Sequence, residues 1–134
     1  MVYTVKVLQE GYSKFENGVY KANGTSTLID GENIKVVVDT LSAWDRDRLV
    51  SSLSRCGVSP SDITHVVNTH GHPDHVGNNN LFIGPGVVHV MGHAIHSSDT
   101  YFTDVTFEHG ETYKIDTNKI EVDTICYCRR RLPE

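Results

Sequence analysis

Hydrophobic and polar residues alternate with the period of β-strands in the first part of the chain. The alternation covers 2–8, and two further apolar runs, 25–29 and 34–38, flank the polar turn sequence 30–33. Period-two alternation is typical of a half-buried strand, and two apolar runs joined by a short glycine-containing turn predict a β-hairpin. We therefore expect a strand, a segment over 13–23 that is loop apart from a short strand near Val19-Tyr20, and a hairpin whose second strand is covered on both faces.

A helical pattern follows this hairpin. Ser42 and Asp45 have the spacing of a capping box, which marks the start of a helix, and Gly57 marks its end. The spacing of the apolar residues predicts a buried stripe along one side of this helix: Leu49, Val50, Leu53 and Cys56. We expect Trp44 to pack in the core.

The remaining apolar runs predict further strands. The runs 63–68 and 87–91 are short and bounded by polar residues, and 112–115 and 119–125 read as a last pair of strands. The segment 92–96 is expected to be a loop. Because a helix separates the strand at 34–38 from the one at 63–68, these two should be parallel neighbours, and the fold class is α/β.

Composition limits the function classes. The chain has 134 residues, which allows one domain, and its net charge of −5 argues against a broad nucleic-acid-binding platform. No segment has the apolar length of a signal peptide or membrane span, so no membrane partner is expected. The three cysteines, Cys56, Cys126 and Cys128, do not form a disulfide framework. An intracellular, reducing location is the simplest account.

Four side chains that can bind metal lie within six residues: His70, His72, Asp74 and His75. Side chains two apart in an extended segment point the same way, and Pro73 keeps the preceding residue extended, so His70 and His72 can bind one ion together. Asp74 and His75 then face a neighbouring position. Imidazole and carboxylate ligands suit zinc, and also manganese or iron. The alternative is a solvated histidine-rich loop.

The spacing His-x-His-x-Asp-His resembles the signature of the metallo-β-lactamase fold superfamily. The flanking segments extend this resemblance from about residue 7 to about residue 122: 10–12, 38–40, Trp44, 57–62 and 69–78 followed by Leu81-Phe82. The resemblance implies an αββα sandwich with two zinc ions in the complete site. His70 and His72 would hold the first ion, and Asp74 and His75 the second.

The resemblance also implies roles for two carboxylates. Asp74 would be catalytic, because it would orient the attacking hydroxide. Asp39 would support the metal loop, since an aspartate that bonds a ligand histidine fixes its orientation. A strand-end turn residue is the alternative for Asp39. Many relatives have glycine where this chain has Leu41.

The resemblance stops before the chain does. We expect 1–125 to form roughly the N-terminal half of a metallo-β-lactamase domain and 126–134 to be a divergent tail, as in a truncated or alternatively spliced product. Catalytic zinc takes three protein ligands, and the signature supplies two to each position. The tail residues Cys126, Cys128 and 129–131 do not convincingly replace the rest.

Three functions stay open. The resemblance implies a di-zinc hydrolase, specifically a phosphodiester-cleaving endoribonuclease that is cytoplasmic or also nuclear and homodimeric, with RNA or a small-molecule ester as substrate. The second is a non-catalytic fragment that binds metal weakly or pairs with a full-length subunit. The third is a glyoxalase-type thioesterase or a mononuclear iron oxygenase. The sequence leaves open whether this chain is itself an enzyme.

Overall fold

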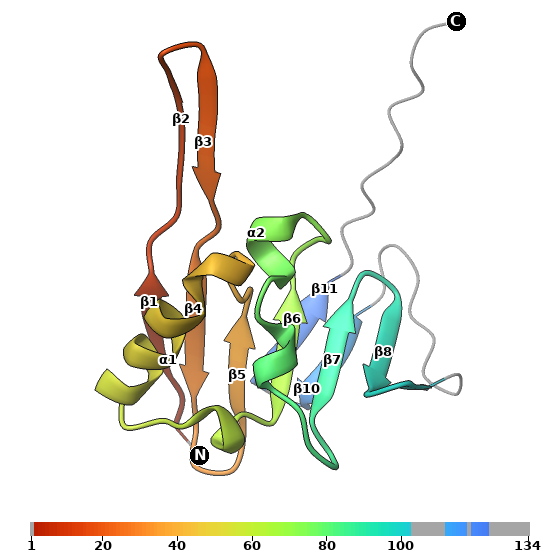
Figure 1. Cartoon of the computed structure of the whole chain (residues 1–134). Coiled ribbons are helices and arrows are strands. Elements are labelled where there is room, and N and C mark those ends of the chain that lie inside the picture. The colour runs from red at the N-terminus through yellow and green to blue at the C-terminus, as the bar shows by residue number, and fades with distance from the viewer. Residues whose placement is uncertain (1, 103–111, 118, 124–134) are drawn as a thin grey trace, which may run out of the picture.

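One mixed β-sheet organises the chain (Figure 1). The computed structural model describes residues 2–102, 112–117 and 119–123. Within them seven strands form this sheet, in the spatial order β1 (Thr4–Gln9), β4 (Ser26–Asp30), β5 (Lys35–Val38), β6 (His65–Asn68), β7 (Val88–Met91), β8 (Ala94–Ser97) and β9 (Thr100–Tyr101). The three central strands β5, β6 and β7 are parallel, and the outer pairs are antiparallel. The predicted α/β class is confirmed.

The predicted hairpin and helix both form. Strands β4 and β5 pair antiparallel from Thr27 opposite Val38 to Asp30 opposite Lys35. The helix begins with a 3₁₀ turn, Ala43–Asp45, and continues as α1 (Arg46–Arg55). The Ser42 amide donates to Asp45 Oδ2 at 3.3 Å, as the capping box predicts, and the Ser42 hydroxyl donates to the same oxygen at 2.6 Å.

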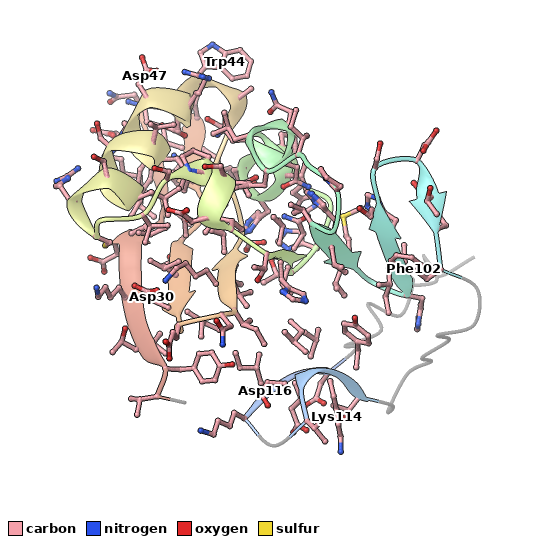
Figure 2. The ribbon with its side chains drawn as sticks, turned by 90° about the horizontal axis from the view of Figure 1, so that it is seen from below. Asp30, Trp44, Asp47, Phe102, Lys114 and Asp116 are labelled. Atoms are coloured by element: carbon pink, nitrogen blue, oxygen red, sulfur yellow. The ribbon has the colours of Figure 1, made fainter. Side chains whose placement is uncertain are left out.

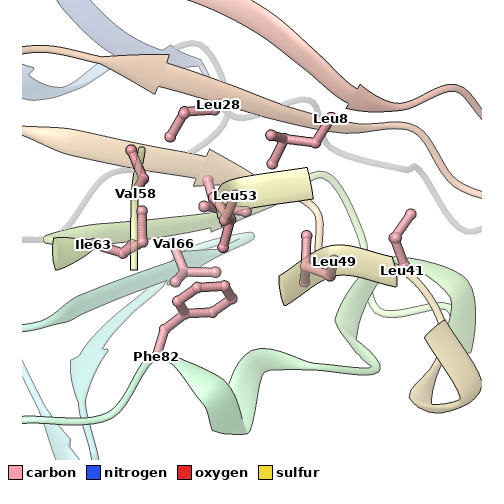
Figure 3. Packing of buried hydrophobic residues seen from close by; sticks show 10 residues of the cluster. Leu8, Leu28, Leu41, Leu49, Leu53, Val58, Ile63, Val66 and Phe82 are labelled. Carbon is pink, nitrogen blue, oxygen red and sulfur yellow. The ribbon is translucent and has the colours of Figure 1, made fainter. Parts of the chain in front are cut away.

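Hydrophobic clusters cover both faces of the sheet. One cluster joins α1 to the sheet and contains Leu8, Leu28, Val37, Leu41, Leu49, Leu53, Val58, Ile63, Val66 and Phe82 (Figure 3). The other lies on the opposite face, beside the hairpin of β10 (Thr112–Asp116) and β11 (Ile120–Asp123). Val36 and Val37 point to opposite faces of the sheet. Both are fully buried, because a cluster covers each face. The prediction that this strand is covered on both sides is confirmed.

The prediction that Trp44 packs in the core is wrong. Its side chain is 91% exposed and projects outward from the helical layer (Figure 2). The buried stripe of α1 is set by Leu49 and Leu53, and Trp44 lies in the preceding 3₁₀ turn, outside that stripe. Cys56, a free thiol, packs at the margin of the core and is only partly buried.

Two segments expected to be loop are hairpins, and the short strand predicted near Val19-Tyr20 is part of the first. The first consists of β2 (Tyr12–Glu16) and β3 (Val19–Asn23), joined through Asn17-Gly18 with φ of 50° and 78°. An Asn-Gly pair is a strong turn signal because both residues tolerate positive φ. This hairpin projects beyond the sheet edge (Figure 1). The second hairpin is β7–β8, which turns at Gly92 with φ of 57°.

Some predictions concern residues outside the described ones. The divergent tail 126–134 with its two cysteines is among them, as is the end of the predicted strand 119–125. Within the described residues, no helix has the length and apolar character needed to cross a bilayer.

Neighbouring residues provide a test of the core. Phe82 is fully buried, whereas Ile83 is 77% exposed. Phe82→Ala should lower the free energy of unfolding by about 3–5 kcal/mol, because it removes buried area and leaves a cavity. Ile83→Ala should change it by less than about 0.5 kcal/mol. Urea unfolding followed by circular dichroism measures both, and equal effects would contradict this packing.

Two histidines of the sheet predict a pH dependence of stability. Burial lowers the pKa of His65, and burial also lowers that of His89, against the opposing effect of its hydrogen bond to the Phe82 carbonyl. A lowered folded-state pKa means that the unfolded chain binds protons first as pH falls. The contribution of these two histidines to the free energy of unfolding is therefore fully present above pH about 6.5 and is lost as the pH falls below it.

For this reason the urea concentration at the unfolding midpoint should decrease as the pH is lowered from about 7 to about 5. The double variant His65→Gln/His89→Gln should show a smaller fall over the same range. A fall as steep in the variant as in the parent would show that other groups carry the dependence.

Candidate metal centre

The metal motif and Asp39 lie at the same edge of the sheet. Strand β5 ends at Val38 and its parallel neighbour β6 ends at Asn68, so the residues that follow them meet at the carboxyl ends. The Asp39 amide donates to the Val67 carbonyl at 2.9 Å, which fixes the two chain segments to each other. This is the edge at which open α/β sheets bind ligands.

The local sequence of the motif determines its backbone. His72 is extended, with φ of −69° and ψ of 150°, as expected for a residue before proline. Pro73 then begins the single-turn helix α2 (Pro73–Val76), which carries Asp74 and His75. Gly24, at the base of the β2–β3 hairpin, packs against this turn. A Cβ there would lie 2.6 Å from the Asp74 carbonyl oxygen and 2.9 Å from His75 Cε1.

The carboxylate of Asp39 accepts three hydrogen bonds from the metal loop. Its Oδ1 accepts from the Thr69 amide at 2.8 Å, and its Oδ2 accepts from the Thr69 hydroxyl at 2.7 Å and from His75 Nδ1 at 2.6 Å. Asp39 is 3% exposed and has a φ of 62°. Aspartate is one of the few residues other than glycine that adopt this conformation readily.

Leu41 also has positive φ, at 63°, and its side chain is buried in the core. The position therefore has a backbone that glycine adopts without strain. In this chain, burial of the leucine side chain offsets that strain.

The bonds at Asp39 determine which histidine nitrogens carry protons. An ionised carboxylate only accepts, so His75 Nδ1 carries a hydrogen, and in the neutral ring the lone pair is then on Nε2. The Thr69 hydroxyl uses its one hydrogen for Asp39. It therefore accepts from His70 Nδ1, 3.0 Å away, and leaves the lone pair on His70 Nε2. One carboxylate thus orients two histidines whose Nε2 atoms are available to a metal ion.

The donor atoms of the motif form two pairs. His70 Nε2 lies 3.0 Å from His72 Nδ1, and His75 Nε2 lies 3.5 Å from Asp74 Oδ2. Two ligand atoms on one tetrahedral zinc ion lie about 3.3 Å apart, given bonds of about 2.0–2.1 Å. Each pair therefore fits one metal position. Within the described ranges, no three His, Cys, Asp or Glu side chains form a group that could hold an ion. The described residues supply two ligands per position.

The pKa of His70 also favours metal binding. Partial burial lowers its pKa, and the nearby imidazoles of His75 and His72 lower it further, against the opposing effect of Asp39 and Asp74. A lower pKa keeps His70 neutral near pH 7, and only neutral imidazole binds a metal ion.

A second set of hydrogen bonds holds the backbone of the motif. The His75 carbonyl accepts from the Thr40 amide at 2.9 Å and from Asn68 Nδ2 at 2.8 Å. Asn68 and Asn79 bond each other through both ends of their carboxamides, at 2.7 and 3.2 Å. The sequence did not predict that Asn68 and Asn79 hold the backbone of the motif. A polar residue at the end of an apolar strand was the available signal.

Most of the chain is similar to one family of known proteins. The family model of the metallo-beta-lactamase superfamily matches residues 19–116. The chain belongs to the metallo-beta-lactamase superfamily. Members of this superfamily are metallo-hydrolases and usually bind metal ions, typically zinc. The chain is therefore related to metal-binding hydrolases.

Two relatives are both called metallo-beta-lactamase domain-containing protein 1. The protein from Xenopus laevis is 54% identical over 81 residues, which cover 60% of this chain and 34% of the relative. The human protein is 32% identical over 119 residues, which cover 68% of this chain and 44% of the relative. The chain therefore spans between a third and a half of these relatives.

A solved structure supports the fold. A Thermotoga maritima protein that is assigned to the metallo-beta-lactamases matches with a TM-score of 0.51 and 31% identity, over 60% of this chain and 39% of that chain. The predicted metallo-β-lactamase fold is confirmed for the matched part.

Asp39→Asn tests the role of the carboxylate in metal binding. Asparagine keeps the shape and tolerates the positive φ, but it removes the anion that orders Thr69 and His75. Loss of such a partner typically lowers metal affinity by about 10–100-fold. The control Asp47→Asn, at an aspartate whose side chain is 97% exposed, should leave affinity unchanged. Competition with a chromogenic chelator measures both, and equal affinities would rule out this role.

Proposed function

We propose that the chain carries the first part of the metal site of a metal-dependent hydrolase. The observation that carries this proposal is the arrangement of four donor atoms in two pairs, with the rings of His75 and His70 oriented by Asp39 directly and through Thr69. Superfamily membership supports it. Zinc is the proposed metal, two ions per complete site, because imidazole nitrogen and carboxylate oxygen suit it. Iron and manganese are the alternatives.

His70 and His72 would hold the first ion, and Asp74 and His75 the second. A bound divalent ion lowers the pKa of water and so supplies a nucleophile at neutral pH. Asp74 is the proposed catalytic residue. Its Oδ2 is 3.5 Å from His75 Nε2, so its carboxylate reaches the second position and could also accept a hydrogen bond from the attacking water.

The proposed reaction is phosphodiester cleavage in RNA, as an endoribonuclease. This substrate rests on the resemblance of the flanking segments, and a small-molecule ester is the other substrate class. Homodimerisation and a location in the cytoplasm, with the nucleus as the alternative, belong to the same proposal.

A second candidate function is supported by the ligand count. With two described ligands for each position, the chain would bind metal weakly and act as a non-catalytic piece or as a partner of a longer subunit. This candidate and the hydrolase predict different behaviour of the purified chain.

Cleavage of a fluorogenic single-stranded RNA and of bis-p-nitrophenyl phosphate by the zinc-loaded chain tests the proposal. The hydrolase predicts turnover that stops on chelation and falls by at least about 100-fold in Asp74→Asn, because the second metal position loses a ligand. Asp47→Asn is the matched control and should retain full activity. Zinc binding without turnover of either substrate would contradict the hydrolase and favour the second candidate.

A further inference from the structure

A cavity of about 510 Å³ is lined in part by the residues that follow the metal motif in the chain, from Asn79 onward. Its walls come from the 3₁₀ helix Asn79–Leu81, the segment that follows it, and strands β7 and β8. This volume is in the range of small-molecule sites. The cavity shares Asn79 with the amide network under His75, but none of the four proposed metal ligands lines it.

The described lining residues combine an apolar wall with uncharged polar groups. Ile83, Pro85 and Val87 supply the apolar wall, and none of the described lining residues is Asp, Glu, Lys or Arg. A pocket without charged groups favours an uncharged ligand, because burying an ion there would leave its charge unpaired.

Two imidazole rings that line the cavity belong to an aromatic stack. His89, His96 and Tyr101 lie directly opposite one another on β7, β8 and β9. Ring centroids are 5.3 Å apart for the first pair and 4.9 Å for the second, with interplanar angles of 27° and 21°. His89 is fixed by a 2.9 Å bond between Nε2 and the Phe82 carbonyl. A planar ring entering the cavity can pack against a surface that is already ordered.

Several polar groups of the cavity are available to a ligand. Among the described residues, the side chains of Asn80, Ser97 and Ser98 have no hydrogen-bond partner. Together they offer a carboxamide and two hydroxyls, which can both donate and accept. Such groups match the mixed donors and acceptors on the edge of a heteroaromatic ring.

We propose that this cavity is a binding site for an uncharged planar heteroaromatic group of the size of a nucleoside. The ring packs against the stacked imidazoles and the apolar wall, and Asn80 bonds the edge of the ring. The site is separate from the metal centre and does not depend on the proposed hydrolysis. A ligand there would contact the Asn79 carboxamide that ties β6 to the metal loop.

Titration of the whole chain with adenosine at pH 7.5, followed by the histidine ring-proton resonances, tests this proposal. The resonances of His89 and His96 should shift to saturation, because an aromatic ring changes the local magnetic field. Ribose 5-phosphate should cause no saturable shift, because it lacks a ring of this kind and carries charge.

Asn80→Ala should weaken adenosine binding between about twofold and about tenfold, the loss expected for one hydrogen bond. Asn33→Ala, at an exposed asparagine in the turn between β4 and β5, is the matched control and should bind as the parent does. Ser97→Phe, which fills the cavity, should abolish binding while the far-ultraviolet circular dichroism of the sheet is retained.

No saturable shift with adenosine, equal binding by Asn80→Ala and the parent, or equal binding of ribose 5-phosphate would each overturn the proposal. These outcomes are independent of metal binding and of RNA cleavage. Failure of the cavity site therefore leaves the proposed hydrolase untouched, and failure of the hydrolase leaves the cavity site untouched.

Discussion

The carboxylate of Asp39 is the constraint on which the metal centre depends. It is almost fully buried, and its three acceptor contacts join the end of β5 to the loop that follows β6. A buried carboxylate without such donors would be strongly destabilising. The loop must therefore place the Thr69 amide, the Thr69 hydroxyl and the His75 ring around it. The orientation of two proposed metal ligands follows from satisfying this one charge: His75 bonds Asp39 directly, and His70 bonds it through Thr69.

The rest of the fold keeps Asp39 in position. The parallel register of β5 and β6 brings the two loops to one edge, and the hydrophobic cluster between α1 and the sheet holds these strands. Thr40 and Asn68 fix the His75 carbonyl. Gly24 lets the base of the β2–β3 hairpin lie against the same turn. The site is thus held by backbone contacts from segments far apart in the sequence.

The sequence predicted the elements with strong periodicity, and it placed the four proposed metal ligands in one short motif. It predicted the β4–β5 hairpin, the helix after Ser42, and the position of the motif just past a strand. It failed for Trp44, because helical periodicity does not fix the direction of a side chain in the 3₁₀ turn before the helix. It also missed Asn68, Asn79 and Gly24, whose contacts depend on tertiary packing and leave no periodic signal.

Nitrogen NMR of the histidine rings in the metal-free chain at pH 7.5 tests whether Asp39 orients the rings, because it distinguishes protonated from unprotonated ring nitrogens. The hydrogen bonds predict that the neutral form of each ring, His70 and His75, carries its hydrogen on Nδ1 and its lone pair on Nε2. Asp39→Ala should release this preference for both rings. Hydrogen on Nε2 of His75 in the unmodified chain would contradict the account, since Asp39 would then not orient the metal ligands.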